Sequence, residues 1–199
     1  MPYWPVLSIL IFLPLAAGLV MGTLRTSGQI RAVALGAGLV EFIFSLPLLL
    51  AFDPQNSSFQ FQELHPWIAK WGINYHLGVD GMSLVLIVLT TFLLPLCVLC
   101  SWSYIKTRVL EFHICLMLMT AACVGVFCAL DLVLFYVFWE AMLIPMFLLI
   151  AVWGGPQRKY ASIKFFVYTL AGSTLLLVAI IAFYRASGTF SIPELLQAE

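Results

Sequence analysis

Six long apolar stretches constrain the fold of this chain more than any other feature of its sequence. A membrane-spanning helix needs about 20 predominantly apolar residues, and the stretches that meet this length are residues 4–24, 32–52, 81–102, 112–130, 132–153 and 161–184. Helices satisfy their backbone polar groups within hydrocarbon, whereas a membrane β-barrel would need strands of alternating polarity, which are absent here. The sequence therefore predicts an all-α integral membrane protein of about six transmembrane helices.

Composition supports a lipid environment and excludes one class of partner. Of the 199 residues, 63% are hydrophobic and 9% are charged, which is more apolar than a single soluble core can hide. The basic residues are scattered and the net charge is zero, so the chain has no basic patch for a nucleic acid. No basic segment precedes the first apolar stretch, which predicts a retained helix rather than a cleaved signal peptide.

The distribution of lysine and arginine predicts the orientation. Basic residues gather in cytoplasmic connections, and seven of the nine lie at the connections after the first, third and fifth stretches: Arg25, Arg31, Lys106, Arg108, Arg158, Lys159 and Lys164. Only Lys70 and Arg185 lie on the other side. We therefore expect a multi-pass protein of the bacterial inner membrane, with a periplasmic N-terminus and a periplasmic loop at residues 53–79 that is anchored by aromatic rings.

Glu140 is the strongest candidate for a functional residue. It lies well inside the fifth stretch, where an ionisable group costs about 2.5 to 3.5 kcal/mol. Such a carboxyl group is typical of a proton relay that faces the interior of a helix bundle. Pro145 lacks an N–H and leaves the carbonyl of Ala141 free beside it, which favours a hydrated path. The alternative is a protonated glutamic acid that only joins two helices by a hydrogen bond.

Two further residues are weaker candidates for proton transfer. Glu41 lies in the middle of the second stretch, ahead of Pro47, and incurs the same cost. Lys164 opens the sixth stretch and shares a helix face with Tyr168. A lysine at a membrane edge also serves as a simple anchor whose ammonium group reaches the headgroups, so both interpretations of Lys164 stay open.

Other polar residues predict structural roles only, and no cofactor or metal site is expected in this chain. Asp80 and Asp131 each begin an apolar stretch, which is typical of helix N-caps. Cys97 and Cys100 form a C-x-x-C pair without a second pair or a nearby histidine, which argues against a zinc or thiol-redox site. The Gly-Gly at 154–155 lacks the lysine and the preceding strand of a nucleotide-binding loop.

Four segments of the sequence carry a resemblance to a known family. They are residues 76–84 (HLGVDGMSL), 138–146 (FWEAMLIPM), 153–155 (WGG) and 161–169 (ASIKFFVYT). With these segments the chain resembles the subunit M family (chain 4 in mitochondria) of the antiporter-like subunits of respiratory complex I, the NADH-quinone oxidoreductase. The resemblance covers essentially the whole chain and is weakest in the first 60 residues.

The resemblance implies a fold, a role and partners. Members of the family have about fourteen helices arranged as two inverted five-helix repeats, so residues 1–110 would form an N-terminal three-helix region and residues 111–199 an incomplete first repeat. Glu140 corresponds to the family's membrane glutamate, which works with a lysine on the seventh helix, beyond this sequence; Lys164 carries over less directly, and Glu41 matches no family motif. The chain would be a subunit of a proton-translocating NADH-quinone oxidoreductase, with other membrane subunits as partners.

FMN, iron–sulfur clusters and quinone would then belong to the partner subunits. Two other functions stay open from the sequence. One is a cation/proton antiporter or hydrogenase-linked pump subunit of the same superfamily, which would need no NADH. The other is a truncated fragment that inserts into the membrane but conducts nothing.

Overall fold

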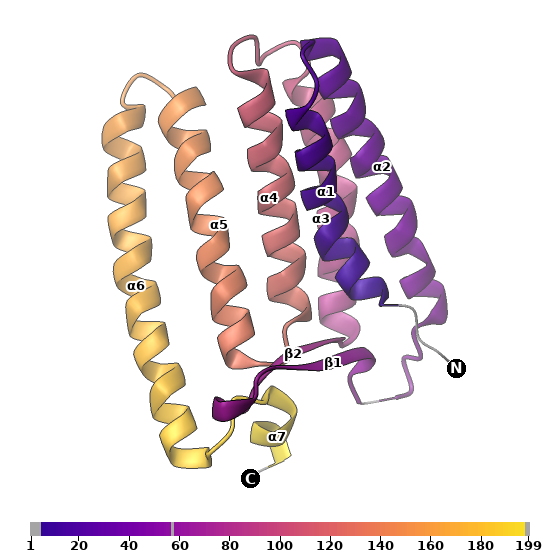
Figure 1. The fold of residues 1–199 in the computed structure, drawn as a ribbon, viewed down its shortest axis with the longest axis vertical. Helices are drawn as coiled ribbons and strands as arrows, with labels where there is room; N and C mark the ends of the chain where they lie inside the picture. The colour runs from indigo at the N-terminus through magenta and orange to yellow at the C-terminus, as the bar shows by residue number, and fades with distance from the viewer. Residues whose placement is uncertain (1–4, 57, 198–199) are drawn as a thin grey trace.

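Helices make up most of the chain in the computed structural model, which describes residues 5–56 and 58–197 (Figure 1). They are α1 (Val6–Gly22), α2 (Ser27–Ala51), α3 (Gly81–Ser101), α4 (Val109–Cys128), α5 (Leu132–Trp153), α6 (Arg158–Ser187) and α7 (Ile192–Gln197). The mostly helical membrane fold predicted from the sequence is confirmed.

The six predicted spans correspond to five long helices and one shorter helix. In the described part of the chain, α2 to α6 are long and apolar enough to cross a membrane, whereas α1 has 17 residues. Helix α1 begins after Pro5 and ends at Gly22, inside the predicted range 4–24, whose first residue, Trp4, lies outside the described residues. Helix α2 begins at Ser27, five residues before the predicted start at 32, because Arg31 is accommodated in the helix and donates to the carbonyl of Ile105 at 2.7 Å.

Helices α1 to α4 pack as a bundle, and the remaining two long helices extend it to one side (Figure 1). Helix α5 packs against α4, and α6 packs against α5. Two apolar clusters fill the α1–α4 bundle. One includes Leu10, Leu48 and Ile87 and lies toward the β-strands, and the other includes Ala34 and Leu94 and lies toward the opposite end.

A β-hairpin occupies most of the connection that was predicted as an interfacial loop at residues 53–79. Strands β1 (Gln60–Ile68) and β2 (Ile73–Val79) pair antiparallel, with Glu63 opposite Leu77. A 3₁₀ turn joins them and ends at Gly72, whose φ of 68° lies in the left-handed region that favours glycine. These strands were not predicted, because Pro66 and two register irregularities interrupt the alternation expected of a strand.

The hairpin connects the ends of helices that are distant in the sequence. The carbonyl of His76 accepts from the amide of Leu130, between α4 and α5, at 2.8 Å. The carbonyl of Leu130 in turn accepts from Ile192, at the start of α7, at 2.9 Å. A Cβ on Gly78 would lie 2.5 Å from the end of the Leu130 side chain, so glycine allows this approach without displacing Leu130. The three segments therefore hold this end of the molecule together.

Glu63 attaches the same hairpin to α1. Its carboxylate accepts hydrogen bonds from the amide of Leu7, at 2.8 Å, and from the Ser8 hydroxyl, which also lies 2.9 Å from the hydroxyl of Tyr75. The first amides of a helix have no partner within the helix and carry a partial positive charge. The hairpin therefore supplies the N-terminal cap that α1 does not receive from Pro5, which makes no capping hydrogen bond.

Candidate functional site

Glu140 lies on α5, eight residues after the start of the helix. Its side chain is half-buried, and its Oε1 atom is buried without a hydrogen-bond partner among the described residues. A rise of 1.5 Å per residue puts it about 12 Å from the start of α5, which is inside the apolar span. The structure therefore places a carboxyl oxygen inside the apolar span without a hydrogen-bond partner, and an ionisable group in such a place is a candidate for proton transfer.

The hydroxyl of Tyr136 lies near the Glu140 carboxyl group. Tyr136 is one turn before Glu140 on the same face of α5, and Ser173 of α6 lies near the same Tyr136 hydroxyl. Ser173 is buried and also donates to the carbonyl of Leu170 at 3.1 Å. Hydroxyl groups both donate and accept, so this set can pass a proton or stabilise either form of the carboxyl group.

The start of α5 is fixed independently of Glu140. Asp131 accepts from the amides of Val133 and Leu134, which confirms the N-cap predicted from the sequence. Its second carboxyl oxygen accepts from the amide of Asn74 in the hairpin at 3.0 Å. Pro145, five residues beyond Glu140, is buried and leaves the carbonyl of Ala141 without its helical donor.

Lys164 does not contact Glu140. It is exposed on α6, and its ammonium group lies 5.7 Å from the centre of the Tyr160 ring, a cation–π distance. Within the described residues, the one ion pair joins Arg108 to Glu111. Tyr168, predicted to share a face with Lys164, is also exposed. The role of Lys164 in proton transfer stays a prediction. In this structure Lys164 contacts Tyr160.

Glu41 lies in a different part of the molecule. Helix α2 packs against α1, α3 and α4, while Glu140 is on α5 (Figure 1). Glu41 is 0% exposed and its two carboxyl oxygens have no partner among the described residues. The structure thus brings none of the three predicted residues Glu41, Glu140 and Lys164 together.

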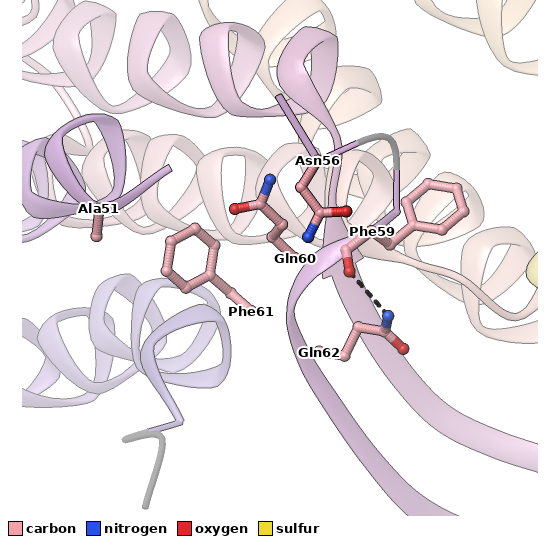
Figure 2. Close-up of a pocket in the computed structure, with 6 residues that line it drawn as sticks. All are labelled: Ala51, Asn56, Phe59, Gln60, Phe61 and Gln62. Atoms are coloured by element: carbon pink, nitrogen blue, oxygen red, sulfur yellow. Dashed lines mark hydrogen bonds between the residues drawn. The ribbon is translucent and has the colours of Figure 1, made fainter. Parts of the chain in front are cut away.

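A surface cavity of about 360 Å³ lies near the start of the hairpin and lacks the chemistry for proton transfer (Figure 2). Its lining residues carry no ionisable side chain: Ala51, Asn56, Phe59, Gln60, Phe61 and Gln62. The Gln62 amide donates to the carbonyl of Phe59 at 2.8 Å, and the Gln60 amide donates to that of Asp53 at 2.7 Å. These amides are therefore already bonded to backbone.

Two family models match consecutive parts of the chain. The model described as NADH-ubiquinone oxidoreductase chain 4, amino terminus, matches residues 40–127. The model described as NADH:quinone oxidoreductase/Mrp antiporter, transmembrane, matches residues 129–199, the part that contains Glu140. The chain is thus similar to membrane subunits of NADH-quinone oxidoreductases over residues 40–127 and 129–199. The resemblance seen in the sequence motifs is confirmed.

Curated relatives of this family are similar over nearly the whole chain. NADH-quinone oxidoreductase subunit M of Rhodobacter capsulatus is 50% identical over 196 residues, which are 96% of this chain and 38% of the relative. NADH-ubiquinone oxidoreductase chain 4 of Arabidopsis thaliana is 47% identical over 175 residues, which are 85% of this chain and 34% of the relative. The chain thus spans less than half the length of these relatives.

Two solved structures share the fold of this chain. Respiratory complex I from Thermus thermophilus contains a chain that superimposes with a TM-score of 0.83 and 27% identity, covering 96% of this chain and 39% of that one. The Mrp complex from Dietzia contains one with a TM-score of 0.77 and 18% identity, covering 94% of this chain and 20% of that one. At that lower identity the likeness concerns the fold alone.

Sequence reasoning found Glu140 but missed its neighbours. The spacing of four residues between Tyr136 and Glu140 is visible in the sequence and was a usable signal. Ser173 is 37 residues away from Tyr136 along the chain, and only the packing of α6 against α5 brings these two residues near each other.

Proposed function

We propose that the full-length protein is a membrane subunit of an NADH-quinone oxidoreductase and carries protons across the membrane. Electron transfer from NADH to quinone would take place in partner subunits, which would hold FMN and the iron–sulfur clusters. The membrane would be the bacterial inner membrane. The observation that carries this proposal is the unpartnered, buried carboxyl oxygen of Glu140 in the segment that matches the transmembrane family model.

In this proposal Glu140 binds and releases the proton. The neutral acid is the form that the span tolerates, because a charge in hydrocarbon is costly. Loss of the proton needs a positive charge or a water chain nearby, and the free carbonyl of Ala141 and the hydroxyls of Tyr136 and Ser173 support such a chain. Lys164, about six residues inside α6, would act as a counter-charge nearer the cytoplasmic end.

A Glu140→Gln variant of the full-length protein tests the proposal. Glutamine keeps the shape of the protonated acid but cannot release a proton. A positioned proton-transferring group contributes about 10²- to 10⁴-fold to its step, so we expect NADH-driven proton uptake by inverted membrane vesicles to fall at least about tenfold. Uptake would be followed by quenching of an acridine dye.

Glu111→Gln is the matched control. Glu111 is exposed at the start of α4 and pairs with Arg108, so the same chemical change there leaves the spans intact. We expect this variant to pump at the wild-type rate. Unchanged pumping in Glu140→Gln, with normal amounts of the protein in the membrane, would refute the role of Glu140.

A cation/proton antiporter is the second candidate, because the model that matches residues 129–199 also describes Mrp antiporter subunits. This function would need no NADH. Vesicles in which a proton gradient is imposed without NADH distinguish the two: sodium added outside would dissipate the gradient if the protein exchanges cations for protons, and would leave it unchanged otherwise.

A further inference from the structure

A second carboxyl group lies sealed inside the α1–α4 bundle, in the middle of α2. Glu41 is 0% exposed, and among the described residues neither of its carboxyl oxygens has a hydrogen-bond partner. An ionised carboxylate in such a place would lack both water and a counter-charge, which costs several kcal/mol or more. The neutral, protonated acid is the form compatible with this site.

Glu41 belongs to a polar layer that separates the two apolar clusters of the bundle. On α2 the clusters include Ala34 on one side and Leu48 on the other, and on α3 they include Leu94 and Ile87. Between the clusters each helix contributes buried residues that are polar, small or proline: Pro14 on α1, Gly38, Glu41 and Ser45 on α2, Thr91 on α3, and Thr120 on α4. At this level the four helices therefore meet through polar, small or proline residues rather than through large apolar side chains.

The polar layer offers acceptors for the proton of Glu41. Ser45 and Thr91 join α2 to α3 through their hydroxyls, which are 2.8 Å apart. Pro95 lacks an N–H, so the carbonyl of the fully buried Thr91 has no helical donor. A carbonyl in that position can accept from a carboxylic acid but gains nothing from a carboxylate.

Close packing brings α2 against α3 near the free carbonyl of Thr91. A Cβ on Gly38 would lie 3.3 Å from the ring nitrogen of Pro95, so glycine allows the two backbones to approach. Side chains on a helix lean toward its N-terminus. The Glu41 carboxyl group, one turn beyond Gly38, therefore leans toward the level of Pro95, where the Thr91 carbonyl lacks its donor.

No charged group of the surrounding helices neutralises Glu41. Helix α1 has no ionisable side chain over Val6–Gly22. The ionisable groups of α2, α3 and α4 are Arg31, Cys97, Cys100, Glu111, His113, Cys115, Cys123 and Cys128. None of these forms an ion pair or hydrogen bond with Glu41 in the described structure. Arg31, the one cation among them at neutral pH, is about 15 Å away along α2 and bonds to Ile105.

We propose that the polar layer around Glu41 is a second proton-binding site of the chain, separate from Glu140. Glu41 binds the proton as a carboxylic acid and releases it as the carboxylate, and the Ser45–Thr91 hydroxyls and the free Thr91 carbonyl belong to the same polar layer. The ligand is a proton, because the two carboxyl oxygens, the two hydroxyls and the carbonyl are fewer oxygens than the about six to eight that a calcium ion takes.

Infrared spectroscopy of the purified complex tests the proposal directly. A protonated carboxyl group has a C=O stretch separate from that of a carboxylate and of an amide. We expect the wild type at pH 7 to have one such band that is missing in Glu41→Gln and present in Glu140→Gln. We also expect this band to decrease as the pH is raised. A spectrum without the band, or a band that persists at every pH at which the complex stays folded, would overturn the proposal.

A measurement on the unmodified protein covers the case in which Glu41→Gln does not accumulate. Dicyclohexylcarbodiimide is apolar and reacts with protonated carboxyl groups inside membranes. Mass spectrometry of native membranes should find its adduct on Glu41 and not on the exposed Glu111, with less adduct at higher pH. If Glu41 stays unmodified while other buried carboxyl groups react, the proposal is wrong.

The same labelling separates a proton site from a sodium site. Sodium and potassium chloride at equal concentration and pH should give equal amounts of the Glu41 adduct. If sodium alone protects Glu41, the layer binds an alkali cation in place of the proton and the proposal fails. Neither outcome depends on pumping through Glu140.

Discussion

At the residue scale, two of the eight acidic side chains in residues 5–56 and 58–197 lie deep inside long apolar helices, and their surroundings differ. Glu140 is half-buried, with the hydroxyls of Tyr136 and Ser173 beside it and with α6 on one side. Glu41 is fully buried inside the bundle. The same residue type thus occupies a half-buried site on α5 and a fully buried site on α2 in the described residues.

Gly125 tests how tightly α4 and α5 are joined beside Glu140. A Cβ at this position would lie 2.4 Å from the Phe138 ring on α5, two residues from Glu140. We expect Gly125→Ala to lower the free energy of unfolding by about 1 to 3 kcal/mol, because the ring is forced out of place. Thermal unfolding of the detergent-purified protein measures the change.

Gly172→Ala on α6 is the control, because nothing lies within 4 Å of its added Cβ. Alanine favours a helix over glycine by about 0.5 to 1 kcal/mol, so this variant should be as stable as the wild type or slightly more stable. A Gly125→Ala protein that unfolds at the wild-type temperature would contradict the packing of α4 on α5.

Single residues were predictable where their own chemistry decides their role. Glu140 stands out because an acid inside a membrane span is costly in free energy. Asp131 stands out because it precedes an apolar run, and it makes the capping hydrogen bonds expected there. Ser173 was not predictable, because an ordinary serine within a helix acquires a role only when α6 packs against α5.

At the element scale, the hairpin is the part of the molecule that links the separate helices. Glu63 caps α1, Asn74 donates to Asp131 at the start of α5, and the carbonyl of His76 accepts from Leu130. These contacts join positions that are 54 to 57 residues apart in the sequence. The uninterrupted apolar run at residues 132–153 predicted α5 correctly, whereas Pro66 and two register irregularities hid the strands at 60–79.

His76 gives the docking of the hairpin a predictable dependence on pH. Burial lowers the pKa of His76 from its usual 6.5, with smaller opposite effects from the charges of Asp131 and Glu194. A lowered pKa in the folded state means that the contribution to stability is present above pH 6.5 and is lost as the pH falls through the folded-state pKa. We therefore expect the backbone amides of residues 129–131 to exchange hydrogen faster at pH 5.5 than at 7.5, after correction for intrinsic rates.

Two variants assign this pH dependence to one histidine. His76→Gln keeps a side chain that can bond to Gln62 but cannot become charged, so the pH dependence should disappear. His65→Gln changes an exposed histidine on the other strand and should leave the pH dependence as in the wild type. Equal behaviour of the two variants would show that another group is responsible.

At the scale of the whole molecule, charge is divided between the two ends of the bundle. The end with the α1–α2, α3–α4 and α5–α6 connections carries seven of the nine basic residues: Arg25, Arg31, Lys106, Arg108, Arg158, Lys159 and Lys164. The hairpin end carries Lys70 and Arg185 together with Asp53, Glu63, Asp80, Asp131 and Glu194. The sequence alone predicted this separation, because up-and-down helices bring alternate connections to the same end.

Labelling from one side of the membrane tests the orientation that this charge separation predicts. With the native cysteines replaced by alanine, we introduce one cysteine at Lys70, exposed in the hairpin turn, or at Thr107, exposed between α3 and α4. A membrane-impermeant maleimide should label Lys70→Cys in spheroplasts and Thr107→Cys only in inverted vesicles, because lysine and arginine are retained on the cytoplasmic side. The reverse pattern would place the hairpin in the cytoplasm. Protons released at the hairpin end would then enter the cytoplasm, which is the side from which the proposed subunit has to remove them.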